Sequence, residues 1–371
     1  MDKAESAVRD ILALAEVGVG GEQPWDLQVT DRNFYRRLLG QGSIALGETY
    51  MDGLWECQQI DVFIYKVLRA GLEHKISVLS LLWPVLWSKL VNLQSRRRAF
   101  DIGKHHYDIG NELYQLMLDK RMTYTCGYWK HADNLSQAQE AKLDLVCRKV
   151  GLKAGMRVLD IGCGWGSFAR FAAERYDVSV VGVTVSQEQI DYGRELCANL
   201  DVDLRYQDYR DVEGRFDRVV SLGMFEHVGP KNYRSYMQTV ERCLQDDGLF
   251  LLHVIGTNTA NLQVDPWTAK YIFPGGVLPL PKQIDAATQG IFIMEDWHNF
   301  GTDYDPTLMA WMTNIDASRA QLEELGYGNR FYRMWRYWLL SAAGSARARR
   351  NQLWQMVYSK NGLDNGYVSV R

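Results

Sequence analysis

The chain has 371 residues, of which 47% are hydrophobic, enough for one large core or two linked ones. Its formal net charge of −3 gives no overall positive field of the kind that attracts nucleic acid. Six cysteines without a Cys-x-x-Cys pair argue against a zinc site and predict a reduced, cytoplasmic protein. The polar, acidic start at residues 1–5 predicts no secretory signal peptide.

Residues 1–100 carry no catalytic motif and are predicted to form a smaller, mainly helical domain that binds lipid or membrane. Within it, Val78–Leu93 is apolar but shorter and more interrupted than a membrane span, which needs about 20 apolar residues. The basic run Arg96–Arg98 follows, and an apolar segment beside cations is typical of a segment that lies on a membrane surface. A buried core helix with a solvated basic end is an equally good interpretation.

A second domain is predicted over residues 101–371. It begins with a connector whose helix is expected over Ser136–Val150, with Ser136 as the N-cap. Strand and helix patterns then alternate, which predicts a parallel, doubly wound α/β sheet with its ligand beyond the carboxyl ends of the strands. The strands are expected at Arg157–Ile161, Val178–Val183, Asp203–Gln207, Phe216–Ser221 and Gly248–Ile255, and the helices at Gly166–Tyr176, Ser186–Leu200 and Asn232–Leu244.

The first of these strands leads into a turn with glycines at alternate positions, Gly162, Gly164 and Gly166. Without a Cβ, this turn lets a small molecule approach the main chain at the N-terminus of a helix. A dinucleotide site is disfavoured because Ser167 replaces the last glycine, and a P-loop is excluded because no Gly-Lys-Ser/Thr follows. The stretch Asp160–Gly166 instead resembles the first motif of S-adenosylmethionine (SAM)-dependent methyltransferases.

The C-terminal part shows weaker patterns. Residues 256–306 hold five of the eight prolines and are expected to form an irregular insertion that acts as a substrate lid. Residues 311–330 give no assignment. A helix is expected over Tyr332–Arg349 and a last strand over Gln352–Tyr358.

Further motifs stand at His105–Asp108, Gly182–Gln189, Gly223–Gly229 and Glu295–Gly301, and one more at Gly47–Gly53. Together they resemble the bacterial cyclopropane-fatty-acyl-phospholipid synthases. The resemblance implies methyl transfer from SAM to a cis double bond of a phospholipid acyl chain, followed by proton loss and ring closure. It also implies a homodimer that is cytoplasmic and peripherally associated with the inner face of the membrane.

The resemblance assigns bicarbonate as the bound base, held by Cys126, Glu226, His253, Tyr304 and the main chain of Ile255. Taken singly, Cys126 and His253 could be ordinary core residues, Glu226 a helix cap and Tyr304 a surface aromatic residue. A carboxylate beside a carbonate anion would meet like-charge repulsion. We therefore expect Glu226 to orient His253 or to share a proton.

The resemblance also assigns cofactor contacts to residues at strand ends and in the connector. For Thr184 and Gln189 helix capping is the alternative, although Ser186 would fill that role better. An aromatic cluster at residues 332–338 either lines an acyl tunnel or packs in a core. The cofactor contacts are Gly162 and Gly164 at the methionine moiety, Thr184 and Gln189 at the ribose, Asp208 and Tyr209 at the adenine, Tyr124 and Thr125 as a closing pair, and Gly223 beside the cofactor.

Three competing functions stay open. A related lipid methyltransferase would add a methyl branch without closing a ring. A methyltransferase for nucleic acid or protein is disfavoured, because Gly223–Glu226 stands where DNA-methylating enzymes carry Asn/Asp-Pro-Pro-Tyr/Phe. A non-catalytic lipid-binding protein would keep the fold but would not bind SAM.

Overall fold

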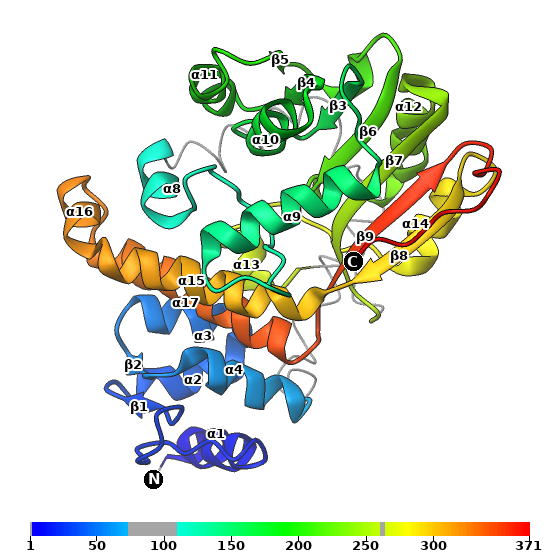
Figure 1. Cartoon of the computed structure of the whole chain (residues 1–371). Helices are drawn as coiled ribbons and strands as arrows, with labels where there is room; N and C mark the ends of the chain where they lie inside the picture. Colours follow the sequence, from blue (N-terminus) through cyan, green and yellow to red (C-terminus); the bar gives the residue numbers. More distant parts are fainter. Residues whose placement is uncertain (1, 73–109, 260–263) are drawn as a thin grey trace. The chain divides into compact units, whose positions relative to one another are not determined.

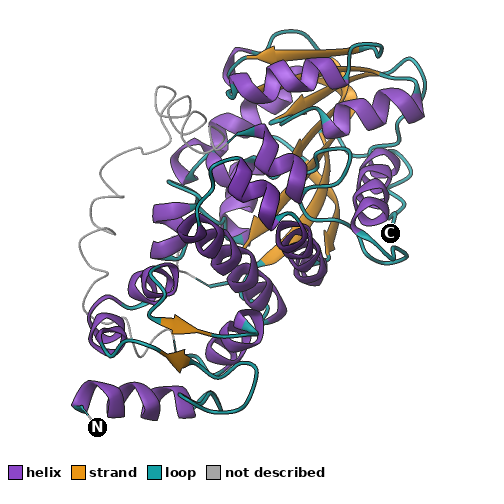
Figure 2. Cartoon of the chain, turned by 90° about the vertical axis from the view of Figure 1, so that its left-hand side faces the viewer, coloured by secondary structure: helices purple, strands orange, loops and turns teal. Residues whose placement is uncertain are grey.

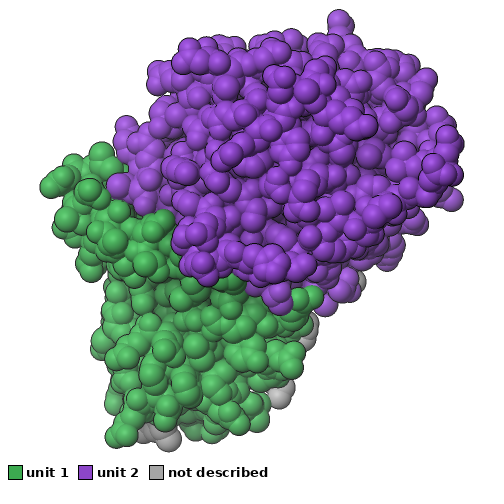
Figure 3. All heavy atoms as spheres, viewed as in Figure 1, with its two compact units in different colours: residues 1–92, 263–274, 304–350 green, residues 93–262, 275–303, 351–371 purple. Residues whose placement is uncertain are grey.

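The computed structural model describes residues 2–72, 110–259 and 264–371. Val78–Leu93, Arg96–Arg98 and the motif His105–Asp108 lie outside the described residues. The chain divides into two compact units, coloured separately in Figure 3. Unit 1 comprises Met1–Asn92, Gln263–Pro274 and Tyr304–Arg350, and unit 2 comprises Leu93–Leu262, Gly275–Asp303 and Asn351–Arg371.

Within the described residues, unit 2 is built on a seven-stranded sheet with the order β5-β4-β3-β6-β7-β9-β8 (Figure 1). Strands β3 to β7 pair in parallel, and β9 pairs antiparallel with both β7 and β8. The predicted α/β class is confirmed, but the sheet is mixed rather than wholly parallel. The bounds are β3 Arg157–Ile161, β4 Ser179–Thr184, β5 Val202–Tyr206, β6 Phe216–Leu222, β7 Leu244–Gly256, β8 Ile293–Asn299 and β9 Gln352–Ser359.

Helices cover both faces of this sheet (Figure 2), because successive strand residues point to opposite faces and each face is apolar. In β3, Val158 belongs to a core formed with α9, α10 and α11, and its neighbour Leu159 belongs to a second core formed with α12 and α14. Each fully buried aliphatic side chain stabilises the fold by about 1.5–3 kcal/mol. The bounds are α8 Asn111–Met117, α9 Leu135–Lys149, α10 Ser167–Tyr176, α11 Gln187–Leu196, α12 Tyr233–Cys243 and α14 Pro281–Thr288.

Two predictions about local structure were wrong. The N-cap of α9 is Asn134, not Ser136: the Asn134 side chain accepts a hydrogen bond from Gln137 N over 3.0 Å. Residues 256–306 are not irregular, since they contain α13 (Pro266–Tyr271), α14 and β8. Pro266 and Pro281 stand at the first helical position, where a missing N–H costs nothing, so these prolines begin helices rather than interrupt them.

Unit 1 is mainly helical, as predicted for the N-terminal domain. Its core is aromatic: the Trp55 ring lies 5.0 Å from that of Tyr50 and 6.4 Å from that of Tyr337, and Trp267 lies 4.7 Å from Tyr337. The short strands β1 (Gln28–Val29) and β2 (Trp55–Glu56) pair antiparallel. The described helices are α1 Lys3–Ala13, α2 Asn33–Gln41, α3 Ser43–Met51, α4 Ile60–Arg69, α13, α15 Tyr304–Ala317, α16 Arg319–Glu324 and α17 Asn329–Arg347.

The unit boundary differs from the predicted boundary near residue 100, because residues 263–274 and 304–350 also belong to unit 1. Helix α17 packs against α3 and α4, and a Cβ on its Gly344 would overlap the carbonyl oxygen of Asp61. Arg347 forms a bidentate ion pair with Asp305 and a further one with Asp61, at 2.8–2.9 Å. Trp335, Tyr337 and Trp338 are buried in unit 1.

Among the helices of residues 2–72, 110–259 and 264–371, none combines the length and apolar character required to cross a membrane.

Candidate active site

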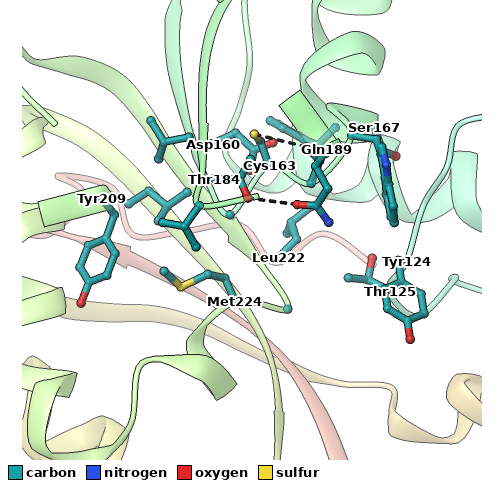
Figure 4. A pocket seen from close by; sticks show the side chains of 18 of the residues that line it. Tyr124, Thr125, Asp160, Cys163, Ser167, Thr184, Gln189, Tyr209, Leu222 and Met224 are labelled. Atoms are coloured by element: carbon teal, nitrogen blue, oxygen red, sulfur yellow. Dashed lines mark hydrogen bonds between the residues drawn. The ribbon is translucent and has the colours of Figure 1, made fainter. Parts of the chain in front are cut away.

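The carboxyl ends of β3, β4, β5 and β6 surround one pocket of unit 2 (Figure 4). Parallel strands bring their carboxyl ends to the same edge of a sheet, so residues distant in sequence meet there. All nine residues that were predicted to contact the cofactor line this pocket: Tyr124, Thr125, Gly162, Gly164, Thr184, Gln189, Asp208, Tyr209 and Gly223.

The turn between β3 and α10 requires glycine. Gly162, Gly164 and Gly166 have φ values of +83°, +55° and +79°, which L side chains rarely adopt. A Cβ at Gly162 would lie 2.5 Å from the Cβ of Met224, whereas no described atom lies within 4 Å of a Cβ at Gly164. The turn therefore presents its main chain to the pocket.

At the end of β4, Thr184 Oγ1 donates a hydrogen bond to Gln189 Oε1 over 3.0 Å (Figure 4). The N-cap of α11 is Ser186, whose hydroxyl accepts from Gln189 N over 3.4 Å. Ser186 therefore performs the capping, and Thr184 and Gln189 form a polar pair in the pocket wall. Beyond β5, Asp208 pairs with Arg210 over 2.9 Å, and the Arg210 guanidinium lies 4.9 Å from the Tyr209 ring.

Lys142 of α9 also lines the pocket, although it was not among the predicted site residues. Its side chain is completely buried, and its Nζ donates to Thr125 Oγ1 over 2.7 Å. Burial lowers the pKa of Lys142 to about 8, against the opposing effect of Asp119, Cys126 and Asp160. Burial likewise raises the pKa of Asp160 to about 7, which the charge of Lys142 opposes. A lysine four residues after the buried Ala138 was the available signal, since both positions share one helical face.

Glu226 follows β6 and is buried. Its Oε1 accepts a hydrogen bond from Ile255 N over 2.6 Å, and its Oε2 has no partner in the described part of the chain. Burial raises the pKa of Glu226 to about 7, so the carboxyl group is partly protonated at neutral pH. The N–H of Ile255, which was expected to face a bound anion, instead donates to Glu226.

His253 lies in β7 and is buried. Its carbonyl oxygen accepts a hydrogen bond from the N–H of the pocket residue Gly223 over 2.9 Å, so His253 lies beside the pocket. Its Nδ1 is 3.2 Å from Gln355 Nε2, and its Nε2 has no partner among the described residues. Burial, with Lys142 and Lys149 nearby, lowers the pKa of His253 well below its usual value, so the ring is neutral. Among the described residues Gln355, not Glu226, is its hydrogen-bonding partner, which corrects the expectation that Glu226 orients it.

Cys126 is buried beside the pocket residue Thr125, with its Sγ 3.2 Å from Gly127 O. Four of the five predicted catalytic residues, Cys126, Glu226, His253 and Ile255, thus belong to unit 2. The fifth, Tyr304, begins α15 and belongs to unit 1, where its ring lies 6.5 Å from that of Trp311.

Comparison with known proteins defines the class. The mycolic acid cyclopropane synthase CmaA1, solved in complex with SAH and CTAB, is 30% identical and superimposes with a TM-score of 0.66 over 70% of this chain and 98% of its own. Together with this similarity, the mixed α/β sheet, the glycine turn and the pocket beside it make this protein a SAM-dependent methyltransferase.

The family model described as mycolic acid cyclopropane synthetase matches residues 94–356, and the chain belongs to that family. The cyclopropane-fatty-acyl-phospholipid synthase of Escherichia coli (strain K12) is 52% identical over 98% of this chain and 94% of its own length. A probable fatty acid methyltransferase of Pseudomonas putida is 39% identical over 67% of this chain and 66% of its own length.

Proposed function

We propose that the protein transfers the methyl carbon of SAM to the cis double bond of an unsaturated phospholipid acyl chain and closes a cyclopropane ring. The observation that carries the proposal is a pair of buried polar atoms, Glu226 Oε2 and His253 Nε2, without partners in the described part of the chain. They lie in a chain 52% identical to a cyclopropane-fatty-acyl-phospholipid synthase. Because an alkene is a weak nucleophile, catalysis depends on position, electrostatics and exclusion of water. The buried walls around Cys126, Glu226 and His253 suit that requirement.

Bicarbonate fits these groups. Glu226 Oε2 and His253 Nε2 are buried without a partner among the described residues, and such atoms require a polar ligand. A protonated Glu226 and a neutral His253 can both donate hydrogen bonds to an anion. The repulsion expected between an ionised Glu226 and bicarbonate then does not arise. Bound there, bicarbonate would supply a base for the proton that leaves the added methyl group. Cys126, which belongs to the same unit, is proposed to complete the set.

The test is the dependence of the rate on bicarbonate. In CO₂-depleted buffer the rate of lipid modification should fall, and added bicarbonate should restore it, while the affinity for S-adenosylhomocysteine stays constant. Glu226→Met should raise the bicarbonate concentration required, because the side chain no longer offers a hydrogen-bond donor to the anion. A rate independent of bicarbonate in both proteins would remove the anion from the proposal.

A second candidate is a lipid methyltransferase that leaves an open methyl branch. The 39% identity to a probable fatty acid methyltransferase favours it over a methyltransferase for nucleic acid and over a non-catalytic lipid-binding protein. The cyclopropane-forming and the methyl-adding enzyme would share the SAM pocket and differ in the mass of the product. We propose in either case that the protein acts as a homodimer at the surface of a phospholipid bilayer.

A further inference from the structure

A row of polar side chains crosses the sheet at the candidate site. Gln355 of β9 is in register with His253 of β7 on one side and with His298 of β8 on the other. Side chains of residues in register lie on the same face of a sheet, here the face that α9 covers. Gln355 is completely buried and His253 is 1% exposed, so their hydrogen bonds are shielded from water.

The hydrogen-bond partners of the two histidine rings indicate which ring nitrogen carries the proton. Gln355 Nε2 is 3.2 Å from His253 Nδ1, and Lys149 Nζ is 3.1 Å from His298 Nδ1. With the Gln355 amide oriented so that its Nε2 faces the ring, its NH₂ group donates and His253 Nδ1 accepts. In a neutral imidazole the proton then sits on Nε2. Phe300 packs near both rings, with centroids 5.9 Å from His253 and 4.9 Å from His298, which restricts their rotation.

We propose that Gln355 is a positioning residue for the reaction: its amide donates to His253 Nδ1 and thereby fixes the neutral tautomer whose Nε2–H is a hydrogen-bond donor for the bound anion. The proposal rests on the proposed function for its catalytic consequence. Lys142 and Lys149 of α9, both buried, disfavour a second proton on the ring and so act in the same direction. The Nε2–H of His253 is therefore a hydrogen-bond donor in a fixed position. His253 does not accept the proton that leaves the methylated substrate.

The experiment compares Gln355→Met, which keeps the volume but loses the donor, with Gln355→Glu, which replaces the donor by an acceptor. Gln352→Met is the matched control, a buried glutamine of the same strand whose Oε1 accepts from Asn299. Long-range ¹H–¹⁵N spectra of histidine-labelled protein read the tautomer, and His253→Asn assigns the signal.

Wild type and Gln352→Met should show His253 protonated on Nε2. Gln355→Met should give mixed tautomers and a kcat on the order of 10–100-fold lower, with the KM for SAM unchanged. Gln355→Glu should move the proton to Nδ1 and lower kcat at least as far; as the near-isosteric variant it keeps the test informative if Gln355→Met does not fold. A wild-type ring protonated on Nδ1, or a Gln355→Met protein with wild-type tautomer and kcat, would overturn the proposal. If wild type forms no lipid product, the proposed function fails, and the spectra still decide the tautomer.

Discussion

Two ionisable residues, Lys142 and Asp160, are buried in the wall of the cofactor pocket. Each is 2% exposed or less, and each shifts the pKa of the other toward its charged form. Lys142 also donates to Thr125, a residue predicted to close over SAM. The charge state of this wall therefore contributes to the stability of the fold, and we expect it to affect cofactor binding as well.

Lys142→Met should destabilise the protein by about 1–3 kcal/mol, because it removes the buried hydrogen bond to Thr125 and the nearby positive charge that favours an ionised Asp160. Adding Asp160→Asn should recover part of that loss, so the double variant is more stable than the sum of the single effects. Urea denaturation measures the free energy of unfolding of the two single variants and the double variant, with the exposed Lys153→Met as control. Strictly additive effects would mean that the two charges do not interact.

Glu226 provides a test by pH. Its pKa is raised from 4.5 to about 7 in the folded protein, so the folded state holds the proton more tightly than the unfolded state. The stability that this adds is complete below about pH 4.5 and is lost as the pH rises through about 7. Glu226→Gln cannot ionise, so its stability relative to wild type should improve over that window, by up to about 3 kcal/mol. A stability difference between wild type and Glu226→Gln that stays constant from pH 4.5 to 8 would contradict this pKa.

At the scale of elements, the strand–turn–helix unit β3–α10 explains why the pocket exists. Gly162 approaches Met224, so its lack of a side chain serves packing, whereas Gly164 faces open space in the pocket. The same residue type thus has two different roles two positions apart.

Alanine at each position should separate these roles. Gly162→Ala should lower the stability of the ligand-free protein, because its Cβ overlaps Met224 and its φ of +83° is strained. Gly164→Ala should cost only about 1–2 kcal/mol of backbone strain but should weaken S-adenosylhomocysteine binding by more than about tenfold. Urea denaturation and calorimetric titration measure the two effects. Equal losses of stability with unchanged binding would show that the turn does not contact the cofactor.

The same elements show what the sequence could predict. Apolar runs of the right length predicted the parallel strands, and the carboxyl ends of these strands predicted the residues that line the pocket. Strand β8 was missed because its exposure is mixed along its length, without the apolar run of a central strand. Gln355 was missed because its importance comes from a partner across the sheet, which no local pattern contains. For Lys142 the helical spacing indicated a buried face but not the hydrogen bond to Thr125.

At the scale of the whole molecule, the chain combines a helical unit with an α/β unit that carries the cofactor pocket. The predicted boundary could not anticipate unit 1, since residues 304–350 join it through packing with α3 and α4. The segments predicted to meet a membrane, Val78–Leu93 and Arg96–Arg98, lie outside the described residues, so their role stays a prediction.

Replacing Arg96, Arg97 and Arg98 by alanine should weaken binding to anionic vesicles, because each cation contributes about 1 kcal/mol near anionic lipid. The expected loss is up to about 100-fold at low salt and smaller at high salt. Vesicle cosedimentation measures it, with neutral phosphatidylcholine vesicles as control. Equal binding of wild type and variant to anionic vesicles would exclude this run from the membrane contact.

The central claim is ring closure on a phospholipid. Its most direct test is mass spectrometry of unsaturated phospholipid vesicles incubated with the protein, bicarbonate and SAM deuterated in its methyl group. We predict acyl chains heavier by a CD₂ unit and without the alkene, because one deuteron leaves the added methyl as the ring closes. A gain of CD₃ would make the protein a methyl-adding relative, and the absence of any lipid product despite cofactor binding would contradict the account.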